Sequence, residues 1–395
     1  MSAQDCYLNA LGMLCAAGDS VATVTQNLRS ETSMLVSTDA YGAGRPVPLG
    51  MYLGELPALP LAQAKWRSRN NRCALAALQQ IEAETAAAIA RYGADRVAVI
   101  IGTSTSGIAE TEAVVSDWVN NSSVAEDYDY AVQEMGACAQ FVAEVLKVNG
   151  PTYGISTACS SGAKALAAAR RLLRAGLCDA VIAGGVDTLC QLTVMGFSSL
   201  EAVSDTRCNP FSRNRNGINI GEGAALFLVS REARGARLCG VGEGSDAHHI
   251  SAPDPSGSGA ARCMQGALDD AGLVASDVDY VNLHGTATPL NDQMESHAMA
   301  QVFGLDTPCS STKPFTGHTL GAAGAIEAGI CWLALCQATD GWLPPHVWDG
   351  VRDPELPAIN LVDAQTRAVA GPRRALSNSF AFGGNNIAVL LERVA

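Results

Sequence analysis

The chain has 395 residues, of which 48% are hydrophobic, so it can bury a large core and divide into two subdomains. Its 26 Lys and Arg against 39 Asp and Glu give a net charge of −13, which argues against nucleic-acid binding by the chain as a whole. The 13 Cys residues form no C-x-x-C pair, and this usage is typical of a reduced cytosolic protein rather than of a disulfide framework.

The sequence also argues against a targeting or membrane-spanning segment. Residues 1–6 contain no basic segment, so we expect no secretory signal. The most apolar run, at 321–338, carries Glu327 and many small residues, and this predicts a buried helix rather than a membrane span. We therefore expect a cytoplasmic protein.

The first 60 residues carry no recognisable catalytic motif. A strand is predicted at Tyr7–Leu11 and a helix around Ser20–Arg29. The Gly- and Pro-rich residues 31–60 then predict an excursion over the surface.

A basic cluster precedes a long helix that is predicted at Cys73–Tyr92. Its cations are Lys65, Arg67, Arg69 and Arg72. Two interpretations are open for these residues: they form the solvated start of a helix, or they form a docking surface for an acidic partner.

Residues 97–146 predict a buried strand and a helical region. The continuous apolar run at 97–103 has the length of a strand that is covered on both faces of a sheet. The turn at Gly102–Gly107 lacks the Gly-Lys-Ser/Thr ending of a phosphate loop, so we exclude nucleotide binding. Residues 108–146 are predicted to be mainly helical.

Cys159 lies between a short strand, predicted to be buried, and an Ala-rich helix at Ala163–Ala175 that ends at Gly176. Small residues on both sides permit a sharp strand-to-helix turn, as at the nucleophile elbow of serine hydrolases. A thiol at a helix N-terminus faces unpaired N–H groups and the positive end of the helix dipole, and both are expected to lower its pKa. Cys159 is therefore a candidate nucleophile, although an isolated Cys is more often a buried structural residue.

The remaining elements alternate strands and helices. A strand at Ala180–Gly184 after the Cys159 helix predicts a parallel crossover. A polar Gly-rich loop then leads into a strand at Ala225–Val229, and the charged residues 232–237 predict a hinge between two halves, 1–238 and 239–395. The second half is predicted to contain helices at 258–271, 291–303 and 321–338 and strands at 278–283, 375–380 and 387–392. This alternation favours an α/β fold of two stacked sheet-and-helix halves.

Two of the six His residues lie in Gly/Thr loops next to buried elements. His284 follows the strand predicted at 278–283, and His318 precedes the buried helix. Such ends of α/β elements are where active sites are built. Taken singly, each is more often a satisfied structural residue, but together with Cys159 they match a specific pattern.

Five motifs in order give the chain its resemblance to a known family. They are Thr157–Ser161, Pro210–Phe211 through Gly221–Gly223, His284–Pro289, Lys313 through Gly324 with Glu327, and Asn378–Asn386. The chain resembles the elongating (Cys-His-His) type of β-ketoacyl-acyl carrier protein synthase, within the thiolase superfamily. The resemblance covers essentially the whole chain and implies a thiolase-like fold, in which two similar halves stack as αβαβα layers.

The resemblance also implies an activity, the decarboxylative condensation of a malonyl thioester with an acyl chain. Cys159 is expected to take the acyl chain as a thioester. His284 and His318 are expected to stabilise the enolate that forms as carbon dioxide leaves. Lys313 and Glu327 match a charged pair that supports His318 and the hydrogen-bond network of the site.

Further residues match positions that handle the substrate and its carrier. Phe382 resembles the gate of the acyl pocket, and its N–H and that of Cys159 resemble the donors that hold the acyl oxygen. Thr286 and Thr288 match hydroxyls that bind the phosphopantetheine arm. The basic cluster, together with Arg207 and Arg213, is expected to dock an acidic carrier protein. We expect no metal and no cofactor beyond the carrier's phosphopantetheine.

Departures from the family pattern leave the pathway open. Ser156 stands where the family often has Asp, Ala381 and Asn385 stand where it has Gly and Thr, and Ala287 and Asn291 stand where it usually has Gly. The product is therefore expected to be either a fatty acid or a specialised polyene or other type II polyketide-like chain. The loop Thr103–Ile108 and residues Phe197–Leu200 are candidates for shaping the acyl pocket.

Two assemblies are expected, and four alternative roles fit the sequence less well. The chain is expected to form a homodimer, or to be the active subunit of a heterodimer with a chain-length factor. A non-catalytic partner subunit usually replaces the nucleophile with Gln, so Cys159 argues against that role. A degradative thiolase needs a second Cys in the C-terminal Gly-rich loop, where this chain has none, and a starter-type synthase uses Asn in place of the second His. A cysteine hydrolase would not need His318 or the Phe382 loop.

Overall fold

A computed structural model describes residues 5–338, 340–369 and 371–394. The twelve strands of this part of the chain are β1 Tyr7–Cys15, β2 Val36–Thr38, β3 Val47–Leu49, β4 Val97–Gly102, β5 Thr152–Ile155, β6 Ala180–Asp187, β7 Gly223–Ser230, β8 Ala236–Ser245, β9 Tyr280–Asn282, β10 Cys309–Ser310, β11 Arg374–Ala381 and β12 Asn385–Arg393.

Helices separate most of these strands. The α-helices are α1 Val21–Arg29, α2 Arg69–Gln79, α3 Glu82–Tyr92, α4 Ile108–Asn121, α5 Ala137–Leu146, α6 Ser161–Arg174, α7 Gln191–Ser199, α8 Ser258–Ala271, α9 Pro289–Phe303, α10 Lys313–Thr316 and α11 Ala323–Cys336. The 3₁₀ turns are η1 Ala64–Trp66, η2 Ala94–Arg96, η3 Tyr130–Gln133, η4 Ala275–Asp277, η5 Leu320–Ala322 and η6 Phe382–Gly384.

Ten strands form one mixed sheet whose two halves repeat the same topology. The strand order is β10-β9-β11-β12-β8-β1-β7-β6-β4-β5. In each half, three outer strands run parallel and the two inner strands are antiparallel to their neighbours. Among the described residues, the hydrogen-bonded strands of the two halves connect where β1 meets β8, through two residue pairs that begin at Tyr7 and Leu8. The prediction of two similar sheet-and-helix halves is therefore confirmed.

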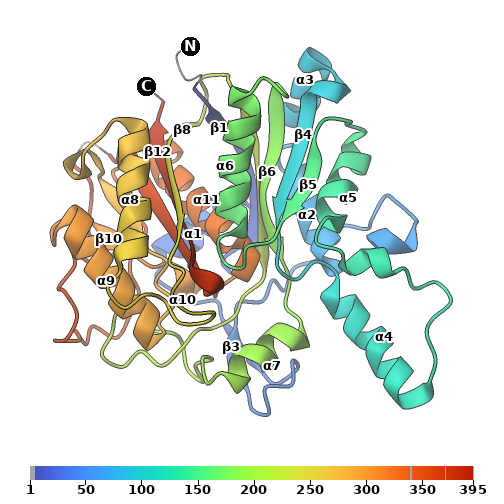
Figure 1. Cartoon of the computed structure of the whole chain (residues 1–395), viewed down its shortest axis with the longest axis horizontal. Coiled ribbons are helices and arrows are strands. Elements are labelled where there is room, and N and C mark those ends of the chain that lie inside the picture. The colour runs from blue at the N-terminus through green and yellow to red at the C-terminus, as the bar shows by residue number, and fades with distance from the viewer. Residues whose placement is uncertain (1–4, 339, 370, 395) are drawn as a thin grey trace.

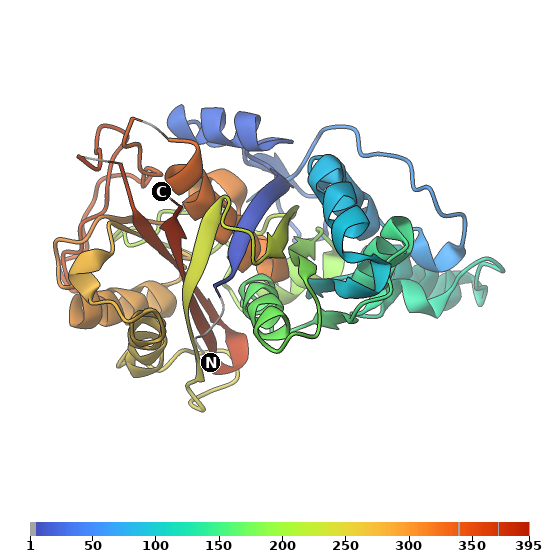
Figure 2. The same ribbon diagram turned by 90° about the horizontal axis from the view of Figure 1, so that it is seen from above.

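The helices and the sheet form five layers (Figures 1 and 2). Helices α6 and α11 lie between the two halves of the sheet, and their apolar residues share one core cluster with β1, β6, β8 and β12. A second cluster joins α2 and α5 to the outer face of the N-terminal half. A third joins α8 and α9 to the outer face of the C-terminal half. The αβαβα layering that the family resemblance implied is thus present.

The buried elements follow from their apolar runs. All six residues of β4 are buried, as expected for a strand that helices cover on both faces. Helix α11 is buried on every side, including Glu327, and this confirms that 321–338 forms a buried helix. Within the described residues, no helix is both long and apolar enough to cross a bilayer.

Several sequence predictions need correction. The helix predicted at Cys73–Tyr92 is two helices, α2 and α3, because the chain breaks at Gln80, whose side-chain amide bonds the N–H and the carbonyl of Met13 on β1. The pairing of β1 with β8 ends at Leu8, so the Gln80 amide provides the hydrogen bonds of Met13 that β8 does not reach. Strand β5 is only half-buried rather than buried, because it is the edge strand of the sheet.

Two further segments differ from the predictions. The charged segment at 232–237 is not wholly a linker, since β8 already begins at Ala236. A domain boundary between 238 and 239 stays a prediction, and it would lie inside this strand. The excursion at 31–60 contains the small hairpin of β2 and β3, in which Val47 and Leu49 are buried.

Candidate active site

Cys159 lies at the strand-to-helix turn that the sequence predicted, four residues after β5 and two before α6. The preceding residue, Ala158, has a φ of 52°, which bends the chain sharply. The Ser161 side chain closes the turn, because it accepts from the N–H of Thr157 at 2.9 Å and donates to the carbonyl of Ala158 at 2.6 Å. The small residues around Cys159 therefore form the sharp turn that the sequence predicted.

Close packing of the two central helices brings Cys159 beside the His318 loop. A Cβ at Gly162 of α6 would lie 2.8 Å from the backbone nitrogen of Ala325 on α11. A Cβ at Gly324 would lie 2.8 Å from the Cβ of Ala163. Only glycine permits this approach, because real Cβ atoms do not come so near to backbone. The N-termini of α6 and α11 thus meet. Cys159 precedes α6, and His318 precedes α11.

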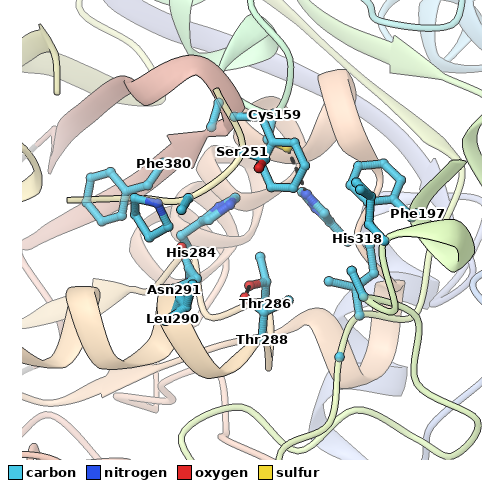
Figure 3. Close-up of a pocket in the computed structure, with 18 of the residues that line it drawn as sticks. Cys159, Phe197, Ser251, His284, Thr286, Thr288, Leu290, Asn291, His318 and Phe380 are labelled. Carbon is cyan, nitrogen blue, oxygen red and sulfur yellow. Dashed lines mark hydrogen bonds between the residues drawn. The ribbon is translucent and has the colours of Figure 1, made fainter. Parts of the chain in front are cut away.

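Cys159, His284 and His318 form one buried cluster, although they come from three distant segments (Figure 3). His318 Nε2 lies 2.9 Å from the Cys159 sulfur. The two imidazole rings are nearly perpendicular, and their centroids are 5.3 Å apart. One ligand atom from each of the three side chains lies within 4.8 Å of the other two.

The burial of this cluster sets its protonation state. Desolvation raises the pKa of Cys159 from its ordinary 9.0 to about 12, although Lys313 opposes the shift. The expectation of a lowered thiol pKa was therefore wrong. Burial and the charge of Lys313 hold the pKa of both His284 and His318 well below the usual value. The resting cluster thus consists of a neutral thiol and two neutral imidazoles.

The Gly-rich loop before β7 holds the backbone of His318. The His318 N–H donates to the carbonyl of Asn219 at 2.6 Å, and the His318 carbonyl accepts from the Gly221 N–H at 2.9 Å. A Cβ at Gly221 would lie 2.4 Å from the Thr316 carbonyl oxygen, so this pairing requires glycine. The motif that ends in Gly221–Gly223 therefore fixes the backbone position of His318.

Two buried carboxylates support His284. Glu295 on α9 accepts from the N–H groups of His284 and Gly285, each at 2.7 Å. Lys313 Nζ lies 3.5 Å from His284 Nδ1, donates to the His284 carbonyl, and pairs with Glu327. The Lys313 and Glu327 side chains are only 2% and 3% exposed. The expectation that this pair supports His318 is corrected, because its direct contacts are with His284.

A cavity of about 380 Å³ opens at the cluster (Figure 3). Thr286 and Thr288 line it, and their hydroxyls are 3.0 Å apart. Phe382 also lines it, and the centroid of its ring is 5.4 Å from that of Phe197. Leu200 is also part of the lining.

The loop Thr103–Ile108, a candidate for shaping the pocket, is not part of the cavity lining. It is instead anchored to Asp187, which directly follows the apolar residues of β6. This carboxylate accepts from Thr103 Oγ1 at 2.6 Å and from the Gly321 N–H at 2.6 Å, and it also binds the backbone and side chains of Ser104 and Thr105. It therefore ties this loop to the start of η5, close to His318.

Sequence reasoning missed Asp187 and Glu295. An acidic residue at the carboxyl end of an apolar strand was a usable signal for Asp187. Glu295 lies 11 residues after His284, and only the packing of α9 under the His284 loop brings the two together. Burial raises the pKa of Glu295 to about 7.

The basic cluster is largely engaged with the body of the protein. Arg69 pairs with the buried Glu222 at 2.6 Å, and Arg72 donates to the carbonyl of Pro57 at 3.1 Å. Arg67 forms an ion pair with an exposed acidic side chain. These contacts favour a structural role for Arg69 and Arg72.

The other three candidate docking cations differ from these. Lys65 lies over the Trp66 ring at 4.5 Å. The side chains of Arg207 and Arg213 have no hydrogen bond or ion pair with the part of the chain that the structure describes. Arg213 lies three residues before Asn216, which lines the cavity.

Comparisons with known proteins agree with this site. Residues 60–234 match the model of the beta-ketoacyl synthase N-terminal domain, and residues 235–347 match that of the C-terminal domain. The chain is 37% identical over 267 residues to 3-oxoacyl-(acyl-carrier-protein) synthase 2 of Staphylococcus aureus, and 38% identical over 269 residues to the protein of that name from Rhizobium meliloti. These alignments span 63% and 62%, respectively, of both this chain and the relative.

Two solved structures share the fold over nearly the whole chain. A ketosynthase, ApeO, in complex with its chain length factor ApeC from Xenorhabdus doucetiae has a TM-score of 0.93 and 46% identity, and the match covers 99% of this chain and 98% of that one. The ishigamide ketosynthase/chain length factor has a TM-score of 0.89 and 27% identity, with full coverage of both chains. The thiolase-like fold and the family resemblance are thereby confirmed, and the chain belongs to the beta-ketoacyl synthase family.

Proposed function

We propose that the chain condenses a malonyl thioester with an acyl group carried on Cys159, and that acyl carrier protein delivers both. The observation that carries this proposal is the contact of a neutral Cys159 thiol with a neutral His318, beside His284 and at the end of an open cavity. A nucleophile, a base and a second hydrogen-bond donor are the groups that such a condensation needs.

The first step is transfer of the acyl group to Cys159. The sulfur attacks the acyl thioester while His318 Nε2 accepts the thiol proton over 2.9 Å. The carrier thiolate then leaves and takes that proton, so the carrier is released as a free thiol. Because burial raises the pKa of Cys159, the thiol needs this base.

The second step is loss of carbon dioxide from the malonyl thioester. Electrons from the breaking C–C bond form an enolate, whose oxygen receives hydrogen bonds from the two imidazoles. The carbanion attacks the Cys159 thioester, a new C–C bond forms, and the released thiolate takes a proton that comes from water. Backbone N–H groups of Cys159 and Phe382 are the proposed donors to the acyl oxygen.

The two histidines are suited to different parts of this sequence. His284 Nδ1 faces the Lys313 ammonium, which can only donate, so the proton of the neutral ring lies on Nε2. His284 is therefore a fixed donor. His318 Nδ1 is buried without a hydrogen-bond partner in the described residues, so neither tautomer is locked. His318 can accept the thiol proton in one step and donate to the enolate in the next.

Intact-mass and product analysis of the purified chain tests the proposal, with acyl-carrier and malonyl-carrier substrates and Cys159→Ala as the control. We expect an acyl adduct and a product two carbons longer with release of carbon dioxide, both absent in the variant. An active enzyme without an adduct on Cys159 would contradict the proposed chemistry.

We also propose that a second ketosynthase-fold subunit covers α4 and α7. Helix α4 has no buried residue and projects from the body of the protein (Figure 1). Trp118 and Val119 on this helix are 60% and 68% exposed, and Leu192 and Met195 are exposed on α7 nearby. Such a patch is typical of a subunit interface. The partner is a second copy or a chain-length factor, as in the ApeO–ApeC complex.

Co-expression with candidate chain-length factors and measurement of mass in solution decide between these partners. If the chain alone condenses as a dimer, the homodimer is the functional unit. If it forms no adduct across short, long and polyene acyl groups until a partner subunit is added, it is the active half of a heterodimer. A monomer with full activity would refute the interface.

Carrier docking is proposed at Lys65, Arg207 and Arg213 rather than at the whole basic cluster. Long-range charge attraction brings an acidic carrier to such residues and is screened by salt. Replacing Arg207 and Arg213 by Ala is expected to raise KM for the carrier-bound substrate with little change in kcat. An unchanged KM would exclude this surface.

A further inference from the structure

The cluster of Cys159, His284 and His318 has the composition of a metal-binding site. One ligand atom from each side chain lies within 4.8 Å of the other two, and all three side chains are buried. Thiolate sulfur and imidazole nitrogen are the ligands that Zn²⁺ prefers. Three protein ligands leave a fourth tetrahedral position, and the cavity at the cluster provides space for it.

The Cys159–His318 contact requires only a small adjustment, and the ligand atoms of the cluster, which lie within 4.8 Å of one another, must close to about 3.5 Å. With Zn–S of about 2.3 Å and Zn–N of about 2.0–2.1 Å, tetrahedral geometry places sulfur and nitrogen about 3.5 Å apart. Cys159 Sγ and His318 Nε2 are 2.9 Å apart, so they must separate by about 0.6 Å. The open cavity beside the Cys159 side chain leaves room for this movement.

The hydrogen bonds around the two rings leave the required nitrogens available. His284 Nδ1 faces Lys313, so Nε2 is the atom that can bind a cation. Among the described residues, the hydrogen-bond partner of His318 Nε2 is the Cys159 thiol, which would become the other ligand. The pairing of Lys313 with Glu327 limits repulsion between the Lys313 ammonium and a bound cation.

We propose that Cys159, His284 and His318 form an inhibitory site for a thiophilic divalent cation, with Zn²⁺ as the expected ion. This inference rests on the proposed function, because inhibition presupposes that Cys159 is the acyl acceptor. On binding, the S–H bond breaks, an S–Zn bond forms, and the proton passes to solvent, with no change of oxidation state. The metal and the acyl group use the same sulfur lone pair, so acylation and metal binding exclude each other.

Binding of Co²⁺ to the chelator-treated full-length chain, without acyl substrate, tests the site directly. Co²⁺ accepts the same ligands and reports a thiolate ligand by a charge-transfer absorption band. We expect one Co²⁺ per chain with this band. Since changes beyond the direct ligands already cost about 10–100-fold in affinity, Cys159→Ala and His318→Ala should each weaken binding by at least about 100-fold. The Cys159 variant should also lack the band.

Exposed histidines near the cavity provide the matched control. His248 and His249 are exposed and lie just before Ser251, which lines the cavity. A double variant with Ala at both positions should keep the full Co²⁺ band. If it loses the band, or if Cys159→Ala keeps it, the cation binds elsewhere and the proposal is overturned.

Enzyme assays separate this inference from the proposed function. We expect micromolar or lower Zn²⁺ to stop acylation reversibly, with recovery on adding chelator and protection of enzyme that is already acylated. Full activity in saturating Zn²⁺ would overturn the inference and leave the proposed function intact. A Cys159-dependent Co²⁺ band in a chain that never condenses, even with a partner subunit, would support the metal site and refute the proposed function.

Discussion

The geometry of the cluster predicts that the two histidines can be separated by their effect on each half-reaction. His318 Nε2 contacts the Cys159 sulfur at 2.9 Å, whereas His284 is hydrogen-bonded through Lys313 and Glu295 and has no such contact. His318→Ala should therefore slow acyl transfer to Cys159 by about 10²–10⁴-fold, the usual contribution of a positioned base. His284→Ala should leave acyl transfer within a few-fold of the wild-type rate.

Decarboxylation should respond differently, because in the proposed mechanism both rings donate to the enolate oxygen. Loss of one oxyanion donor typically costs about 10²–10³-fold, so both variants should lose carbon dioxide release by that factor. Acyl transfer is followed by the mass of Cys159 in rapidly quenched samples, and decarboxylation by release of labelled carbon dioxide. Chemical denaturation of each variant checks that the fold is intact.

Two measurements make the test of His318 sharper. Without its base, the variant depends on the thiolate fraction, so its acylation rate should rise about tenfold per pH unit while the pH stays below the thiol pKa of about 12. Added imidazole should partly restore the rate at neutral pH by entering the cavity. If His318→Ala acylates at the wild-type rate, or if His284→Ala loses acyl transfer equally, this division of roles is wrong.

Three further changes test the packing and the charges around the site. Gly162→Ala should lower the free energy of unfolding by about 1–3 kcal/mol, because its Cβ would crowd Ala325. Gly196→Ala has open space around it within helix α7 and should leave the free energy of unfolding unchanged or raise it by up to about 1 kcal/mol; an equal loss for both variants in urea titrations would contradict the packing argument. Ala287→Gly should raise the free energy of unfolding by about 1 kcal/mol, because it removes the strain of a left-handed φ of 64°, and this gain exceeds the cost of the added entropy of the unfolded chain. A lower free energy of unfolding in the same titration would be evidence against strain at this residue. Burial raises the pKa of Glu295 from 4.5 to about 7, so the folded state binds this proton more tightly than the unfolded state does. The resulting stabilisation is present below pH 4.5 and is lost as the pH rises to 7, and Glu295→Gln should remove up to about 3 kcal/mol of this loss. An unchanged dependence of the free energy of unfolding on pH would show that Glu295 does not titrate in this range.

The elements that were predicted well are those whose burial is uniform. Strands β4 and β6 and helix α11 are covered on all sides, so each appears in the sequence as an unbroken apolar run. Strand β8 was missed because it contains three glycines, which weaken the signal of a strand. Helix α7 was missed because only one of its residues is buried.

At the site, the sequence identified the candidate residues but not their partners. Cys159, His284 and His318 each lie at the end of a recognisable element, and their combination matched the family pattern although no single one of them was decisive. The pairing of Lys313 with His318 was implied by the family resemblance. The structure pairs Lys313 with His284 because helix α10 presents its side chain to the end of β9.

The protonation state of Cys159 could not be derived from its place at a helix N-terminus. A helix end contributes at most about 2 kcal/mol, and one pKa unit corresponds to about 1.4 kcal/mol, so the dipole lowers a pKa by less than two. Burial raises the pKa of Cys159 from 9.0 to about 12, which exceeds the effect of the helix. Burial and the base have a common origin, because the glycine contact between α6 and α11 both encloses the sulfur and places His318 at 2.9 Å from it. The packing that disfavours the Cys159 thiolate thus also places beside the thiol the imidazole that the proposed mechanism uses as its base.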